Sequence, residues 1–272
     1  DAVSDDITAI FWNPAGLVYM SETSVYLSHI SWLAEIEYEA VGIARTFKDI
    51  GSFGFSVSYL NSGDIEETTF DEPEGTGDYF TCSDMMLGLT YARRLTDKFS
   101  FGFNLKYIRE QLDDLVSTAW STDFGVLYYT DFKSLRLGMS IRNFGPEIRL
   151  SGDYYDYDNG TQLSDPSDYL AYHFPMTFKL GAAMELVETE ENRVTIAADL
   201  VHPNDNLERI NTGIEAVLWK TFALRGGYTF RHDTAGPAAG AGFLWKGMTI
   251  NYSYSDYGIL DWVQRFDFVF NL

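Results

Sequence analysis

Apolar and polar residues alternate with a period of two through most of the chain. Residues 99–107 show the pattern clearly, with Phe, Leu and Tyr at the odd positions and Ser, Gly, Asn and Lys between them. The pattern recurs at 51–59, 248–254 and 266–272. Successive side chains of a β-strand point to opposite faces, so this period predicts strands with one apolar face and one polar or small face.

The alternating segments predict fourteen strands that start near residues 23, 36, 51, 85, 99, 120, 135, 176, 193, 210, 222, 238, 248 and 264. Most are about 9–12 residues long, the length that a tilted strand needs to cross a bilayer. All seven prolines lie outside these segments or at their edges, as expected because proline cannot donate to a strand ladder. A short helix fits only near residues 6–20. We therefore expect an all-β fold, a closed antiparallel transmembrane β-barrel.

The connections between these strands alternate in length. They are short around 48–49, 96–98, 131–133, 188–192, 219–221 and 246–247. The connections that alternate with these short ones along the chain are mostly longer, notably at 61–84, 145–175 and 255–263. The connection near 33–35 is an exception. Short turns at one rim and long loops at the other are typical of outer-membrane barrels.

The long loops carry much of the acidity of the chain. Lys and Arg number 19 against 40 Asp and Glu, a net charge of −21. Residues 61–80 and 151–170 are rich in Asp, Glu and Tyr and contain no Lys or Arg. Aromatic residues are enriched at protein interfaces, so we expect these loops to bind a protein partner. The candidate partner-binding residues are Asp64, Glu66, Glu67, Tyr79, Asp153, Tyr154, Tyr155, Asp156, Tyr157 and Asp158.

Several function classes lack support in the sequence. The acidity argues against nucleic-acid binding, which needs Lys and Arg on the phosphates. Cys82 is the single cysteine and the four histidines show no metal spacing, so we expect no metal and no cofactor. The acidic loop at 153–160 fails the helix-loop-helix calcium pattern, which leaves only an irregular calcium site open. No Gly-x-Ser-x-Gly motif or phosphate-binding loop is present, so we expect no enzyme, although a barrel enzyme with a polar dyad stays open.

Alternation also predicts which charged residues point into the barrel, because a charge at mid-bilayer on the lipid side costs about 2–4 kcal/mol. Such residues could bind the carboxylate or phosphate head of a ligand. We favour pairing with each other and with the N-terminal segment, because buried charges are usually paired. The predicted lumenal charges are Arg94, Lys106, Asp123, Arg136, Arg142, Lys179, Asp199, Glu215 and Arg225.

The N-terminal stretch from Asp5 to Leu17 (DDITAIFWNPAGL) resembles the DD-x-T-A-x-x-W-N-P-A-G-L signature of the PorV/PorQ family, within the FadL-like outer-membrane barrel superfamily. Further matches lie at 91–98, 104–110 and 143–146. Together with the strand pattern, the resemblance covers essentially the whole chain. The glycine-rich piece that such families usually carry before the Asp-Asp pair is missing, which predicts a processed or incomplete N-terminus.

The resemblance implies a fourteen-stranded barrel in the bacterial outer membrane, formed by residues 23–272. Residues 1–22 would fold into the lumen as a hatch. The implied hatch residues, which would seal or gate the pore, are Asn13, Pro14, Ala15, Gly16 and Leu17.

The resemblance also implies a function. PorV-like members act in type IX secretion, where they engage the translocon and the signal domains of cargo, and the short chain favours this branch. We therefore expect a non-enzymatic accessory of protein secretion or surface export that sits in outer-membrane lipid and binds a protein partner. The alternative is a FadL-like channel for a hydrophobic small molecule. A third possibility is a soluble all-β binding protein, since β-sandwiches also alternate.

Overall fold

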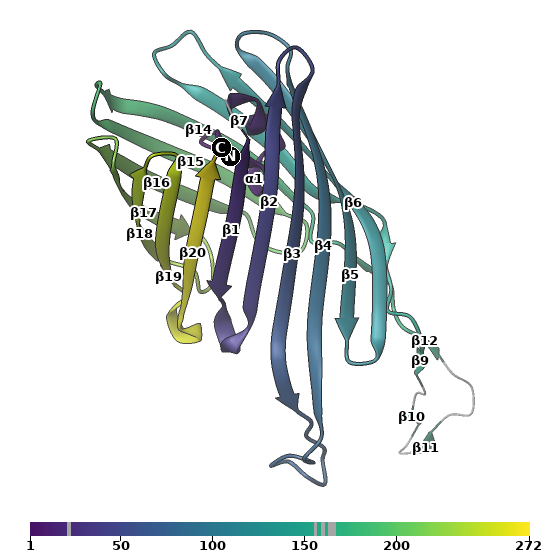
Figure 1. The fold of residues 1–272 in the computed structure, drawn as a ribbon. Helices are drawn as coiled ribbons and strands as arrows, with labels where there is room; N and C mark the ends of the chain where they lie inside the picture. Colours follow the sequence, from purple (N-terminus) through teal and green to yellow (C-terminus); the bar gives the residue numbers. More distant parts are fainter. Residues whose placement is uncertain (21–22, 155–156, 159–160, 163–166) are drawn as a thin grey trace.

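The computed structural model describes residues 1–20, 23–154, 157–158, 161–162 and 167–272. Fourteen strands of this described part close into one antiparallel barrel, which confirms the predicted fold (Figure 1). None of the helices among the described residues is long and apolar enough to cross a membrane. In barrel order the strands are β1 (Ser24–Ser31), β2 (Glu37–Phe47), β3 (Gly51–Glu66), β4 (Tyr79–Arg94), β5 (Phe99–Leu112), β6 (Leu115–Tyr129), β7 (Arg136–Phe144), β14 (Thr177–Glu188), β15 (Arg193–Pro203), β16 (Arg209–Leu218), β17 (Phe222–Phe230), β18 (Pro237–Trp245), β19 (Met248–Asp256) and β20 (Trp262–Asn271).

Short elements lie outside the barrel wall. Three two-residue strand pairs occupy the connection between β7 and β14: β8 (Glu147–Ile148) with β13 (Tyr172–His173), β9 (Asp153–Tyr154) with β12 (Ser167–Asp168), and β10 (Tyr157–Asp158) with β11 (Thr161–Gln162). The N-terminal segment forms α1 (Ala9–Trp12) and the 3-10 helix η1 (Pro14–Tyr19). Two further 3-10 turns, η2 (Leu33–Glu35) and η3 (Gly258–Leu260), connect barrel strands.

The two rims differ, as the connection lengths predict. In Figure 1 the short turns lie at the upper end, while the β3–β4 hairpin and the β9–β12 strands extend furthest at the lower end. The predicted long connection between β5 and β6 is wrong, because these strands pair as far as Leu112 and Leu115 and leave a two-residue turn. The predicted starts of β4 and β6, near residues 85 and 120, were also too late, because the strands begin at Tyr79 and Leu115. These strands continue past the bilayer, where the alternation is weaker.

The polar faces of the strands point inward, as alternation predicts. On β5, Ser100, Asn104 and Lys106 are buried, while Phe101 and Phe103 on the outer face are half-buried. The buried apolar cluster lies between the N-terminal segment and the wall, and not between two sheets. It consists of Ile7, Ala9, Ile10, Leu17, Met20, Tyr26, Ala40, Ala44, Ala92 and Val269. The core of this protein is therefore the docking site of its N-terminal segment.

Candidate functional site: the hatch and the lumen

The N-terminal segment, residues 1–20, which we call the hatch, turns sharply at Asn13 between α1 and η1. The Asn13 side chain is fully buried, accepts a hydrogen bond from the Ala15 main-chain N–H at 3.2 Å and donates one to the Val126 carbonyl at 3.1 Å. Pro14 occupies the first position of η1, where its fixed φ favours the helix and its missing N–H costs nothing. One side chain therefore caps η1 and ties it to β6.

The inner wall is shaped to receive the hatch backbone. A Cβ atom on Gly102 would overlap the main chain of Pro14 and Ala15, and one on Gly125 would overlap the Asn13 side chain. Ser100 donates a hydrogen bond to the Ala15 carbonyl at 3.1 Å, and Ser52 donates one to the Leu17 carbonyl at 3.1 Å. Glycines thus provide the clearance, and wall serines add hydrogen bonds to two carbonyls of η1, of which that of Leu17 also accepts the Met20 main-chain N–H.

The predicted hatch residues lie together against β2 to β6. Pro14, Ala15, Gly16 and Leu17 are all buried, and Gly16 passes so close to the Ser4 carbonyl that any side chain would overlap it. The opposite wall, β14 to β20, is left largely uncovered. The hatch therefore fills one side of the lumen.

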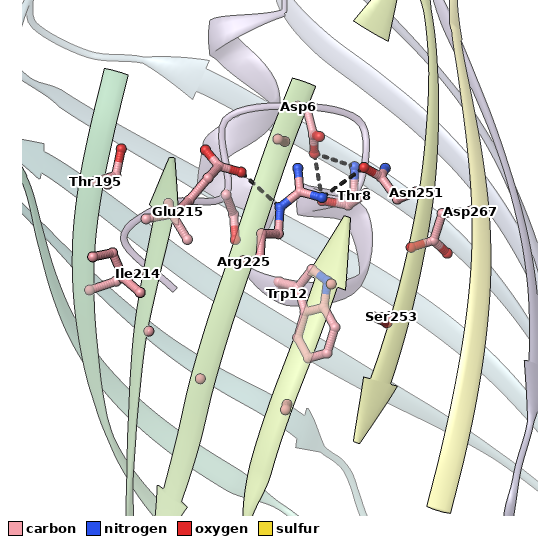
Figure 2. A pocket seen from close by; sticks show the side chains of 18 of the residues that line it. Asp6, Thr8, Trp12, Thr195, Ile214, Glu215, Arg225, Asn251, Ser253 and Asp267 are labelled. Atoms are coloured by element: carbon pink, nitrogen blue, oxygen red, sulfur yellow. Dashed lines mark hydrogen bonds and ion pairs between the residues drawn. The ribbon is translucent and has the colours of Figure 1, made fainter. Parts of the chain in front are cut away.

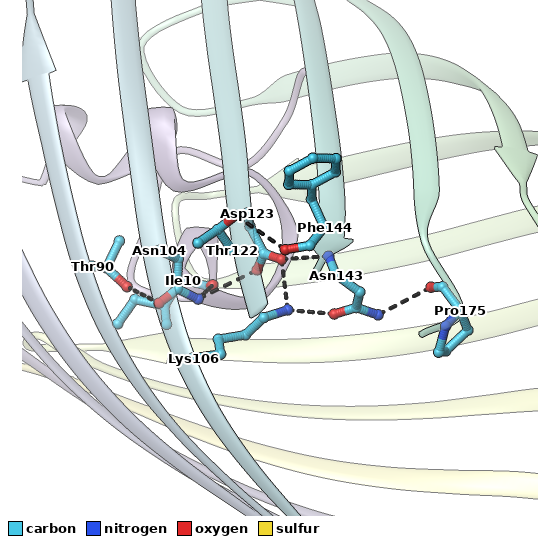
Figure 3. Close-up of polar contacts among 9 residues, drawn as sticks. All are labelled: Ile10, Thr90, Asn104, Lys106, Thr122, Asp123, Asn143, Phe144 and Pro175. Atoms are coloured by element: carbon cyan, nitrogen blue, oxygen red, sulfur yellow. Dashed lines mark hydrogen bonds and ion pairs between the residues drawn. The ribbon is translucent and has the colours of Figure 1, made fainter. Parts of the chain in front are cut away.

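A polar network fixes the lower edge of the hatch to β4, β5, β6 and β7 (Figure 3). The buried Lys106 ammonium lies 2.5 Å from the Asp123 carboxylate and also donates to the Asn143 side chain. Asp123 accepts the Asn143 main-chain N–H at 2.7 Å, where the β6–β7 register shifts. Asn104 donates to the Ile10 carbonyl of α1 at 3.4 Å. The network replaces ladder hydrogen bonds that the irregular β6–β7 pairing loses.

The other predicted lumenal charges lie inside the barrel, most of them paired. Glu215 accepts hydrogen bonds from Arg225 at 2.8 Å and from Arg193 at 3.2 Å. Arg136 pairs with Glu185 at 2.5 Å and donates to the Ala2 carbonyl at 2.8 Å.

The remaining four predicted charges contact the N-terminal segment. Asp199 accepts from the Asp1 amino group at 3.0 Å. Arg94 lies over the Tyr19 ring, and Arg142 and Lys179 lie over the Trp12 ring.

Sequence reasoning missed three of these partners: Glu185, Arg193 and Trp12. Glu185 shares the inward phase of Lys179, and Arg193 that of Asp199, so the period of two contained the signal for both. Trp12 gives no such signal, because its environment comes from strands far away in the sequence.

A cavity of about 760 Å³ occupies the uncovered half of the lumen, between residues 1–12 and strands β14 to β20 (Figure 2). Its wall combines paired charges such as Glu215 and Arg225 with small residues such as Ala197, Gly213 and Gly227. Trp12 projects into it from the hatch. Burial in this region raises the pKa of Asp5 to about 6, and the neighbouring Asp6 carboxylate acts in the same direction. The cavity is large enough for a small organic ligand.

The predicted partner-binding residues lie at the long-loop rim. Asp64 and Glu66 end β3, Glu67 follows it, and Tyr79 begins β4; all four are exposed. In the second loop, Asp153 and Tyr154 form β9, and Tyr157 and Asp158 form β10. Tyr155 and Asp156 lie outside the described residues. Among the described residues, no group of three or more His, Cys, Asp or Glu could hold a metal ion.

Comparison with known proteins identifies the family. The family described as "Type IX secretion system protein PorV" matches residues 1–203, which include the whole hatch and the strands through β15. The chain belongs to the PorV family. It is a β-barrel of the bacterial outer membrane, and its family is one of secretion components. No curated protein matches this PorV-family chain.

Solved structures share the fold of this PorV-family chain at low sequence identity. The CymD monoaromatic hydrocarbon channel is 12% identical with a TM-score of 0.63, over 100% of this chain and 94% of that one. The Ralstonia pickettii toluene transporter TbuX is 12% identical with a TM-score of 0.62, over 97% and 92%. The P. putida toluene transporter TodX is 12% identical with a TM-score of 0.61, over 98% and 94%. At this identity the similarity shows the fold alone.

Proposed function

We propose that this chain is a non-enzymatic binding component of type IX secretion, which docks a secretion translocon or a cargo signal domain at its long-loop rim. The observation that carries the proposal is the PorV-family match over residues 1–203. That stretch includes the hatch and both acidic loops. The matched part therefore contains the proposed docking surface and the hatch, while β16 to β20 complete the barrel beyond it.

The β3–β4 hairpin supplies the docking surface. Both strands have 16 residues, whereas the strands on the opposite wall have 9 to 12, so the hairpin tip stands beyond the rest of the rim. Residues 61–80 carry seven carboxylates and no cation. A surface of this kind favours a basic partner patch, and salt should weaken the association.

The hatch supports a binding role over a conducting one. Asn13, Ser52 and Ser100 tie it to the wall with hydrogen bonds, and its Ile10 and Leu17 side chains are fully buried in the apolar cluster against the wall. Undocking it would expose that cluster and break those bonds together. A barrel that holds its hatch in this way is suited to staying closed while its rim binds a protein.

The test compares charge removal at the two rims. Replacing Glu72 and Glu74 with Gln neutralises two exposed carboxylates in the β3–β4 loop. Replacing Glu190 and Glu191 with Gln removes the same charge from an exposed short turn. After mild-detergent purification from native outer membranes, the first variant should recover less translocon or cargo and show a weaker salt dependence, and the second should match the parent. Equal recovery by both variants, or recovery of neither partner by the parent, contradicts the proposal.

The second candidate function is passage of a hydrophobic small molecule, and the lumenal cavity beside the hatch favours it. In that case the hatch would control uptake, and the loops would matter little. Replacing Asn13 and Pro14 with Ala should then change the entry of a hydrophobic dye into cells, while Glu72→Gln with Glu74→Gln should not. The docking proposal expects no dye entry through the parent protein.

A further inference from the structure

Three cations from distant parts of the barrel converge on one aromatic ring of the hatch. The Lys179 ammonium lies 5.2 Å from the centre of the Trp12 ring, the Arg142 guanidinium 5.7 Å and the Arg265 guanidinium 5.9 Å. These residues belong to β14, β7 and β20. Trp12 itself is 39% exposed, although it lies within the barrel, because it borders the cavity. The ring therefore faces open space with positive charge around it.

Only one of the three cations is neutralised at close range. Arg265 donates to Asp267 at 2.8 Å and also contacts the Tyr26 hydroxyl. Lys179 has no carboxylate within 4 Å and no hydrogen-bond partner among the described residues. The Arg142 Nε atom is buried and has no acceptor within the same described part. Elsewhere in the lumen Lys106, Arg136 and Arg225 each have a carboxylate partner.

The nearby acids are engaged elsewhere. The two Asp199 carboxylate oxygens lie 3.2 and 3.0 Å from the Asp1 main-chain nitrogen, and Asp199 acts on Lys179 only from a longer distance. One oxygen of the Asp1 carboxylate accepts from Ser140 at 2.9 Å, and the other is buried without a partner among the described residues. Half-buried cations without a partner are costly, and a negatively charged group beside Lys179, the one of the two that lines the cavity, would relieve that cost.

Away from these cations, the cavity has room for a compact apolar group of a ligand. Opposite the hatch the wall offers Ala197, Gly213 and Gly227, whose small side chains leave a flat surface. Beyond them the wall turns polar at Glu215, Arg225 and Asn251 (Figure 2). The apolar surface is therefore short, bounded by Trp12 on one side and by hydrogen-bonded charges on the other.

We propose that the lumenal cavity binds a compact amphipathic anion, with a carboxylate or phosphate at Lys179, where the nearby Arg142 adds positive charge from behind the lining, and a body of one or two rings against Trp12 and the Gly/Ala wall. The inference goes beyond the docking role and does not depend on it. A neutral hydrocarbon would leave both cations unpaired, so the site selects for charge.

The experiment measures ligand binding to the full chain in phosphatidylcholine nanodiscs by calorimetry, with empty nanodiscs subtracted. The probes are 2-naphthoate, 2-naphthyl phosphate, the neutral analogue 2-naphthalenemethanol, and dodecanoate as a long-chain carboxylate. We expect naphthoate, naphthyl phosphate or both to bind at least about tenfold more tightly than the neutral analogue, because charge-assisted hydrogen bonds are the strong ones. Binding of the neutral analogue with equal affinity, binding of dodecanoate but of neither naphthyl anion, or no binding at all overturns the proposal.

Variants locate the site. Lys179→Gln should weaken binding of the naphthyl anion by about tenfold and Arg142→Gln, behind the lining, by less, while Lys179→Arg, which keeps the charge, should retain it. The matched control is Lys246→Gln, because the Lys246 ammonium lies 5.1 Å from the Trp245 ring but sits in a short turn outside the lumen. Each variant is first checked for the heat-modifiable mobility of a folded barrel. Unchanged binding by folded Lys179→Gln, or an equal loss in Lys246→Gln, contradicts the assignment. Partner recovery by Lys179→Gln should equal that of the parent, which keeps this test separate from the docking proposal.

Discussion

The close fit between Gly102 and the hatch makes the docking of the hatch directly testable. A Cβ atom at this position would come within 3.0 Å of the main chain of Pro14 and Ala15, a separation that real Cβ contacts essentially never show. Main chain in a 3-10 helix cannot rotate away as a flexible side chain can. In Gly102→Ala, therefore, the hatch itself has to move.

The cost follows from the contacts that such a movement breaks. Overpacking a filled site costs about 1–3 kcal/mol. Moving η1 also strains the hydrogen bonds from Ser100 to Ala15 and from Asn13 to Val126, each of which contributes about 0.5–1.5 kcal/mol. We expect the docked hatch to lose about 2–6 kcal/mol, which lowers the ratio of docked to undocked molecules by about 30-fold or more.

Cleavage by chymotrypsin measures this ratio, because the peptide bonds after Trp12 and Tyr19 lie inside the barrel and reach the protease only when the hatch leaves the wall. The matched control is Gly213→Ala on β16, where the nearest atom to the new Cβ is the Gly226 carbonyl oxygen at 3.6 Å and the hatch is not in contact. In nanodiscs, Gly102→Ala should be cut at these sites at least about 30-fold faster than Gly213→Ala. Equal cleavage rates would refute the argument that glycine clearance holds the hatch.

Three further outcomes are expected. Phe101→Arg, on the outer face of β5, should reduce the yield of barrel assembled into membranes, because an Arg on the lipid side costs about 2–4 kcal/mol. Ser253→Arg, at a position that lines the cavity, should assemble normally. Equal yields of the two variants would contradict the assigned facing. Lys106→Met should destabilise the folded barrel by about 3–5 kcal/mol, because it leaves the Asp123 carboxylate buried without its cation. The double variant with Asp123→Leu should lose less stability than the sum of the two single variants. Additive losses in a denaturant titration would argue against the ion pair. The raised pKa of Asp5 favours its neutral form in the docked hatch, so docking should weaken as pH rises from about 4 through about 6 and then level off, and Asp5→Asn should remove this dependence of the chymotrypsin cleavage rate.

The fold could be predicted from the sequence because each barrel strand has one face toward lipid and one toward the polar lumen. Lipid outside and polar surface inside impose a period of two, as in 99–107, and the prolines and turns mark the ends. Where a strand leaves the bilayer this constraint disappears. That is why the pairing of β5 and β6 out to Leu112 and Leu115 was not predicted.

The site was predictable in part. The period of two places the side chain of Lys106 or Arg225 in the lumen, but it does not say which acid each one meets. The partners depend on strand tilt and register, which bring Glu185 to Arg136 across the β7–β14 seam. The environment of Trp12 depends on three strands that are more than 120 residues away in the chain. No local pattern contains that information.

The central claim is that the long-loop rim docks a secretion partner, and site-specific photocrosslinking in native membranes tests it most directly. A benzophenone side chain at Tyr79 probes the long-loop rim, and one at Trp219 probes the short-turn rim; the two positions are 61% and 63% exposed. The docking proposal predicts crosslinks from position 79 to a translocon subunit or a cargo signal domain, with little or none from position 219. Crosslinks to those proteins from position 219 alone, or from neither position, would contradict it.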